Sequence, residues 1–264
     1  MNLYRLHFII IFCTLLFSSC KEKEPLPLPK EKQGSLTLIF SQTIDKQPVQ
    51  FHQMSYTNTA GNSYQVNEIK YFISKLVLMS ASGKPVEIKQ NSGIHYVDNS
   101  ISSTLQWRIA PIPAGEYVSL SFVFGLDEND NQSNRFVNPP ESNFSWPEIL
   151  GGGYHYMQIN GKFLNKDGAI QNMNIHTGIG QIRNEENEIT SFVHNHFKVN
   201  LPLKFVIEEN KTVSLKLNME IQRWFDTPNL YNFDEFGTGI MQNQRAQQLL
   251  KENGWNVFDL VIND

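Results

Sequence analysis

Residues 146–161 read Trp-Pro-Glu-Ile-Leu-Gly-Gly-Gly-Tyr-His-Tyr-Met-Gln-Ile-Asn-Gly, and residues 174–178 read Asn-Ile-His-Thr-Gly. Residues 154–163 alternate as in a half-buried β-strand, on which side chains two apart point to the same face. On this pattern His155 shares the more apolar face with Met157 and Ile159, where an unpaired imidazole is costly. His155 therefore needs either a hydrogen-bond partner or a metal ion, and both readings stay open.

Short alternating segments separated by turn residues recur along the chain. They predict strands at 35–41, 51–56, 66–79, 94–98, 105–109, 117–126, 154–164, 172–177, 192–199, 201–203, 212–221 and 255–260. Pro202 makes its short segment an edge strand, since proline cannot donate to a ladder. Residues 240–252 predict one helix, ended by Asn253-Gly254. We therefore expect an all-β fold, an antiparallel β-sandwich of the Greek-key, immunoglobulin-like kind with one C-terminal helix.

Composition narrows the function classes. The chain has 264 residues, 40% hydrophobic and 18% charged, which is globular composition. Its formal net charge of −4 and the absence of a basic run give no reason to expect a nucleic-acid partner. The sequence has no Gly-x-Ser-x-Gly elbow, no His-Glu-x-x-His motif and no phosphate-binding glycine loop, so we expect no enzyme activity.

The N-terminus has the pattern of a lipoprotein signal. A basic start, Met1–Arg5, precedes an apolar run at 6–17 that is too short to span a bilayer comfortably. Phe17-Ser18-Ser19-Cys20 then resembles a lipobox, in which the cysteine receives the lipid. The alternative is a plain cleavable signal with an incidental cysteine. We predict lipidation at Cys20, which would anchor the protein to a membrane.

These segments divide the chain into a lipoprotein signal peptide at 1–19, a lipidated tether at 20–34 and a domain at 35–264. Lys21-Glu22-Lys23-Glu24 resembles a signal that sends some lipoproteins to the outer face of the outer membrane, although a solvated tether fits equally well. We therefore expect a lipid-anchored outer-membrane protein, with display on the cell surface left open. Only Cys13 and Cys20 are cysteines, so the domain has no thiol for a nucleophile or metal site.

Histidines are the remaining candidates for chemistry. His194 and His196 are two apart, so on a strand both would project from one face and could hold one metal ion. A solvated face is the alternative. Imidazoles without thiolates suit copper or zinc, and a methionine thioether suits Cu(I). Met157 and Met173 lie close in sequence to His155 and His176, although methionine on a strand usually packs in the core.

The central stretch also carries a family resemblance. Its Trp-Pro-Glu…Gly-Gly-Gly-Tyr-His-Tyr-Met…Gly run and the later His-x-Gly are similar to the MbnP-like copper-binding domain of bacterial lipoproteins. Pro-Ala-Gly-Glu-Tyr at 113–117, Phe-Val-Phe-Gly-Leu at 122–126 and Met-Glu-Ile-Gln-Arg-Trp-Phe at 219–225 extend the match. The resemblance covers roughly residues 35 to 260.

The resemblance implies a monomeric β-sandwich that binds copper outside the cytoplasm through histidines. It also implies a tryptophan beside the metal that a dihaem peroxidase-like partner oxidises to kynurenine. Carried over by position, His155 and His176 are candidate ligands and Trp146 is the candidate for modification. Trp146 and His155 are nine positions apart, farther than in well-studied family sites, so a plain core role for Trp146 stays open.

Two functions follow. The first is an envelope lipoprotein that binds copper for acquisition or storage, without turnover, with His155, His176, His194 and His196 as candidate ligands. The second is a surface-displayed β-sandwich that binds a glycan or protein through Trp107, Trp146 and Tyr154. The copper hypothesis requires at least two of the four histidines to converge, whereas the second hypothesis predicts dispersed histidines and an exposed aromatic patch.

Overall fold

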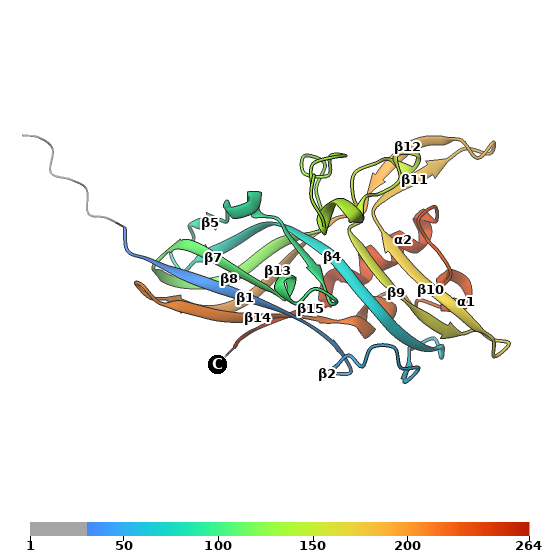
Figure 1. Cartoon of the computed structure of the whole chain (residues 1–264), viewed down its shortest axis with the longest axis horizontal. Coiled ribbons are helices and arrows are strands. Elements are labelled where there is room, and N and C mark those ends of the chain that lie inside the picture. Colours follow the sequence, from blue (N-terminus) through green and yellow to red (C-terminus); the bar gives the residue numbers. More distant parts are fainter. Residues whose placement is uncertain (1–30, 264) are drawn as a thin grey trace, which may run out of the picture. The chain divides into compact units, whose positions relative to one another are not determined.

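The alternating segments form two sheets that share one hydrophobic core in a computed structural model, which describes residues 31–263 (Figure 1). The first sheet has the order β15-β14-β1-β2, with β7 also paired to β1. In it, β1 runs parallel to β14, and the other pairs are antiparallel. Its strands are β1 (Gln33–Ile44), β2 (Gln47–Pro48), β7 (Gln106–Pro113), β14 (Thr212–Glu220) and β15 (Phe258–Ile262).

The second sheet is antiparallel and has the order β10-β9-β4-β8-β13. Its long central strand β4 also pairs with three short strands, β3, β5 and β6. The strands are β3 (Tyr56–Thr57), β4 (Ser63–Ser80), β5 (Pro85–Glu87), β6 (His95–Asp98), β8 (Gly115–Phe124), β9 (Met157–Leu164), β10 (Ile170–Thr177) and β13 (Phe197–Ile207).

A hairpin and short helices complete the described chain. The hairpin joins β11 (Ile179–Arg183) to β12 (Ile189–His194), and the helices are α1 (Phe233–Phe236) and α2 (Gln244–Asn253). Single turns of 3₁₀ helix lie at Gln90–Gly93, Ser102–Leu105, Glu141–Phe144, Glu148–Leu150, Ile221–Phe225 and Gly254–Asn256. None of the helices in the described residues has the length and apolar character needed to cross a bilayer.

Residues of both sheets meet in the main core. Leu38 of β1, Leu217 of β14 and Ile73 of β4 are fully buried in one cluster. Across the two sheets, Phe122 of β8 meets Phe258 of β15 edge-on, with ring centroids 5.3 Å apart. The residues of this core, from Leu36 to Leu260, all lie in the compact unit Glu31–Asp264.

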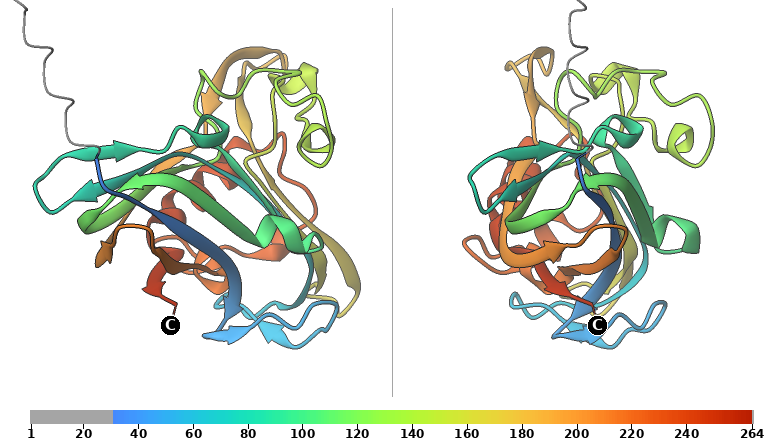
Figure 2. Two further views of the ribbon diagram at one scale, coloured as in Figure 1. Left: turned by 60° about the vertical axis from the view of Figure 1, so that its left-hand side comes forward. Right: turned by 90° about the vertical axis from the view of Figure 1, so that its left-hand side faces the viewer.

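A smaller aromatic cluster lies under the long loop between β8 and β9. It contains Phe72, Ile94, Tyr96, Leu126, Phe144, Trp146, Leu150, Tyr154, Tyr156 and Ile179, and we call it the second cluster. The loop, residues 125–156, lies beside the β11–β12 hairpin at one end of the domain (Figure 2). A Cβ at Gly151 would lie 2.8 Å from Ile179 Cγ2 and 3.1 Å from Phe192 Cδ1, so the loop backbone packs closely against the hairpin at this glycine.

The expected fold class is confirmed, because the domain is all-β with a C-terminal helix. Some strand boundaries differ from the predicted ones. Of the predicted strand at 51–56 only Tyr56 lies in a strand, the short β3, and the predicted strand at 192–199 is broken at Asn195 and His196. The helix begins at Gln244 because the Asn243 side chain accepts a hydrogen bond from the Ala246 amide, an N-cap. The short helix α1 was not expected.

The structure also bears on the predicted edge strand at 201–203 and on the predicted start of the domain. Pro202 lies in β13, the last strand along the second sheet's order, and the β8 register shifts between Pro202 and Phe205, so the edge-strand prediction is confirmed. β1 begins at Gln33, two residues inside the predicted tether. The predicted signal peptide at 1–19, Cys20 and the tether up to residue 30 lie outside the described residues.

Candidate metal centre

The triple glycine builds a tight reversal that a side chain would block. Gly151, Gly152 and Gly153 all have positive φ, between 66° and 116°, a region that favours glycine. A Cβ at Gly153 would overlap the Asn131 side chain. The reversal lets the Trp146 amide donate to the Gly153 carbonyl at 2.8 Å, which folds residues 144–146 back alongside residues 153–155.

His155 projects from this reversal and not from a strand. β9 begins at Met157, so the predicted strand start at 154 is three residues early. Met157 packs in the main core, whereas the His155 ring lies against Trp146 and His176, so the two do not share a face as predicted. Its imidazole contacts Phe144 and Trp146 of the second cluster. Nδ1 lies 3.1 Å from the Phe144 carbonyl, which can only accept, so Nδ1 carries the proton. Nε2 is then an unprotonated nitrogen, buried and without a hydrogen-bond partner in the described residues.

His176 reaches the same place from β10. Its Nε2 lies 2.7 Å from Asn160 Oδ1 on the neighbouring strand β9. The Asn160 amide is oriented by Glu68, because its Nδ2 donates to the Glu68 carboxylate at 2.9 Å. Asn160 therefore presents its oxygen to the imidazole, so His176 Nε2 carries the proton and Nδ1 has the free lone pair. Each histidine is held in one tautomer by a neighbour, as metal-ligating histidines usually are.

The two imidazoles meet edge to face beside the tryptophan. Their ring centroids are 5.2 Å apart with the planes at 79°, and the Trp146 ring centroid is 4.8 Å from that of His155. Two metal–nitrogen bonds of ~2.0 Å would place two ring centroids ~5–6 Å apart, so the observed spacing fits one bridging ion. Trp146 is held by a hydrogen bond from Nε1 to the Leu150 carbonyl at 3.2 Å and by Gly178 against its ring face.

Burial keeps both imidazoles neutral. Loss of hydration lowers the pKa of His155 from 6.5 to about 4, with the nearby His176 as the next cause. Burial, and then the positive charge of Lys70, lowers the pKa of His176 to about 4. Both rings therefore offer lone pairs at neutral pH without first losing a proton, which is the state that a metal needs.

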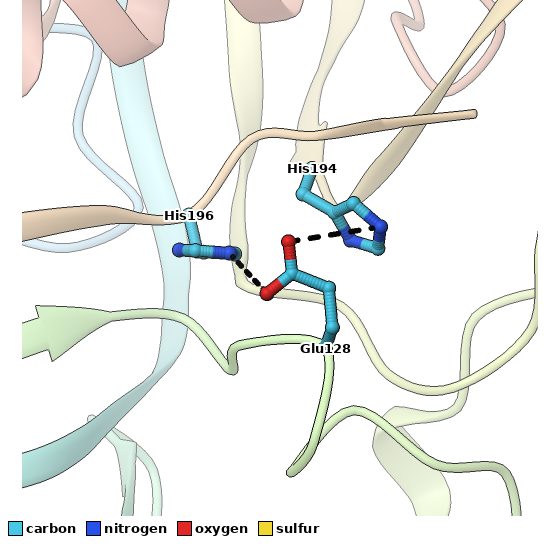
Figure 3. Close-up of side chains that lie close together, drawn as sticks. All are labelled: Glu128, His194 and His196. Atoms are coloured by element: carbon cyan, nitrogen blue, oxygen red, sulfur yellow. Dashed lines mark hydrogen bonds and ion pairs between the residues drawn. The ribbon is translucent and has the colours of Figure 1, made fainter. Parts of the chain in front are cut away.

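His194 and His196 form a separate group. His194 ends β12, and His196 lies in the break before β13, so they are not on one strand as predicted, yet their ring centroids are 6.1 Å apart. Both face Glu128 of the β8–β9 loop, and the three ligand atoms lie within 4.8 Å of one another (Figure 3). The four predicted histidines thus form two pairs. The sequence alone did not connect these histidines with Glu128, Asn160 or Glu68. Asn160 lies 16 residues from His176, Glu128 lies 68 residues from His196, and Glu68 lies 92 residues from the Asn160 that it orients.

Other candidate residues are placed elsewhere. Met157 and Met173 are fully buried in the main core between the sheets, which leaves the histidine pair without a thioether from either residue. The contact residues of the glycan or protein hypothesis are also buried: Trp107, Trp146 and Tyr154 are each 3% exposed or less. They cannot form the exposed aromatic patch which that hypothesis requires.

Comparison with known proteins gives the family. The family model described as MbnP matches residues 33–242, most of the chain, so the chain belongs to the MbnP family. The family is associated with copper. Among solved structures, MbnP from Methylosinus trichosporium is similar in fold, with a TM-score of 0.57 and 15% identity over 88% of this chain and 100% of that chain. No curated protein matches.

Proposed function

We propose that this protein is an envelope lipoprotein that binds copper between His155 and His176, for acquisition or storage and without turnover. The observation that carries the proposal is the buried, unpartnered Nε2 of His155, on a ring whose centroid is 5.2 Å from that of His176 on β10. A buried polar atom without a partner in the protein is satisfied by a water molecule or by a bound ligand, and a basic imidazole nitrogen beside a second imidazole suits a metal ion. Membership of the MbnP family supports copper as that ligand.

The surroundings favour Cu(I). The pair supplies two neutral nitrogens and no carboxylate, and it borders Phe144 and Trp146 in an apolar cluster. The free energy needed to bury an ion without compensating charge rises steeply with its charge, so a monovalent ion is easier to place there than a divalent one. Cu(I) accepts coordination by two imidazoles in an apolar site. A divalent ion would need further ligands to complete its coordination there.

Trp146 fits two roles in this proposal. Packed against His155 and buried, it excludes water from the metal and fixes the imidazole. By the family resemblance it is also the residue that we propose to be oxidised to kynurenine, by a dihaem peroxidase-like partner. Its contact with His155 supports that assignment because the family's modified residue lies beside the metal. Intact mass of the protein purified from its own envelope would report the modification.

The proposal is tested by Cu(I) titration of residues 31–264 against a competing chelator under reducing conditions. We expect one equivalent bound by the parent, and at least 100-fold weaker binding in His155→Gln and in His176→Gln. The matched control is His95→Gln, since His95 is another partly buried histidine with a lowered pKa but is stacked between Phe40 and Trp107. Unchanged Cu(I) affinity in both site variants, with native circular dichroism, would exclude this site.

A further inference from the structure

Glu128, His194 and His196 form a cluster that the copper proposal does not use. His196 Nε2 is 3.2 Å from Glu128 Oε2, and His194 Nε2 is 3.9 Å from Glu128 Oε1 (Figure 3). The second distance is too long for a hydrogen bond. His194 Nδ1 is buried and has no hydrogen-bond partner in the described residues. Neither nitrogen of His194 is therefore satisfied by the protein.

The backbone on the histidine side is built to present both rings together. Asn195, which separates them, is 4% exposed and points inward. Its amide donates to the Gly178 carbonyl at 3.0 Å and accepts from Gln244 of α2 at 2.9 Å. Because Asn195 is fixed inward at the break between β12 and β13, the residues on either side of it turn toward Glu128.

The loop on the other side is equally anchored. Lys75 of β4 pairs with Asp130 at 2.8 Å and with Asp127 at 3.5 Å, and Arg135 pairs with Asp130 at 3.2 Å. These contacts neutralise the carboxylates that flank Glu128. Glu128 itself pairs with no lysine or arginine in the described part of the chain, so its charge faces only the two imidazoles.

Two imidazoles and one carboxylate are the ligand set of a divalent cation. The carboxylate supplies a hard oxygen and a negative charge, which the buried pair lacks, and three protein ligands leave a coordination position for water. Ligand atoms of a tetrahedral site with ~2.0 Å bonds lie ~3.3 Å apart, so a set within 4.8 Å needs only small side-chain rotations to close. The Glu128 side chain is 56% exposed and free to make them.

We propose that Glu128, His194 and His196 form a second metal site, for a divalent ion of the zinc type, independent of the histidine pair. Binding joins the loop of residues 125–156, which carries both Glu128 and Trp146, to the junction of β12 and β13. The ion thereby clamps the loop that encloses the proposed copper site. The alternative arrangement is an ion pair between Glu128 and a protonated histidine, which needs no metal.

The test uses Zn²⁺ as the probe and calorimetric titration of residues 31–264 without an affinity tag at pH 7.5. We expect one Zn²⁺ per chain, with affinity at least tenfold weaker in each of Glu128→Gln and His196→Ala. His52→Asn is the matched control, because His52 is exposed and its positive φ is tolerated by asparagine. Thermal denaturation in Zn²⁺ should show a shift in the parent and His52→Asn that is absent in Glu128→Gln.

Zn²⁺ affinity within twofold of the parent in Glu128→Gln would overturn the proposal, as would loss of Zn²⁺ binding in His155→Gln equal to that in His196→Ala. Cu(I) titration of Glu128→Gln separates this proposal from the copper proposal. Unchanged Cu(I) binding with lost Zn²⁺ binding shows two independent sites. Loss of both metals shows one shared site and contradicts the independence proposed.

Discussion

The copper site should tolerate acid far better than an ordinary pair of histidines. Two imidazoles with a pKa of about 6.5 each compete with a proton, and at pH 5.5 each is protonated about tenfold over its neutral form, which would weaken a two-histidine site about 100-fold relative to pH 7.5. In the folded protein, burial lowers the pKa of both His155 and His176 to about 4. Both rings stay almost entirely neutral at pH 5.5, so Cu(I) affinity should change less than twofold over this range.

The assay is competition with a chelator whose own Cu(I) affinity is calibrated at each pH. The titration runs from pH 7.5 to 5.5 on residues 31–264, with Glu128→Gln measured in parallel to remove any contribution from the proposed site of Glu128, His194 and His196. Affinity should fall only as the pH approaches 4. A loss of about 100-fold by pH 5.5 would refute the argument that burial keeps these imidazoles unprotonated, and with it the assignment of the buried pair as the Cu(I) ligands.

Three further perturbations test the surrounding structure. Gly178→Ala places a Cβ 2.7 Å from Trp146 Cε3, so thermal denaturation should show a loss of about 1–3 kcal/mol, and an unchanged melting temperature would contradict this packing. Burial lowers the pKa of His95 from 6.5 to about 4, below its unfolded value, so its contribution to stability is complete above pH 6.5 and is lost as the pH falls toward 4. At about 1.4 kcal/mol per pKa unit the loss is about 3 kcal/mol, and urea unfolding of His95→Gln should show a correspondingly flatter pH dependence. Glu68→Ala frees Asn160 to rotate its amide, so Cu(I) affinity should weaken about tenfold, and equal affinity would show that the tautomer is not held by this contact.

The fold class could be predicted because the alternation of apolar and polar residues that marks each strand is a local feature of the sequence. The alternation along 212–221 places Leu215 and Leu217 in the core of β14, as the period of two requires. The family resemblance pointed to His155 and His176, which the structure brings together. The strand assignment of His155 was wrong because alternation continues smoothly through residues 154–157, whereas the three positive-φ glycines before it set the backbone direction.

The partners of the histidines could not be predicted, since they depend on the pairing of distant strands. Glu68 and Asn160 come together only through the register of β4 and β9, where Glu68 lies opposite Asn160. Glu128 sits in a polar loop and meets His196 across 68 positions of sequence. The motifs indicate which residue types carry the chemistry, and the tertiary fold decides which side chains orient them.

Histidine ¹⁵N NMR can show whether His155 Nε2 and His176 Nδ1 are the two copper ligands. Cu(I) is diamagnetic, so each ring nitrogen can be followed as one equivalent is added to residues 31–264. We expect His155 Nε2 and His176 Nδ1 to shift, while His155 Nδ1 and His176 Nε2, which are hydrogen-bonded to Phe144 and Asn160, keep their protons. Shifts confined to His194 and His196, or no shift at His155, would contradict this ligand assignment.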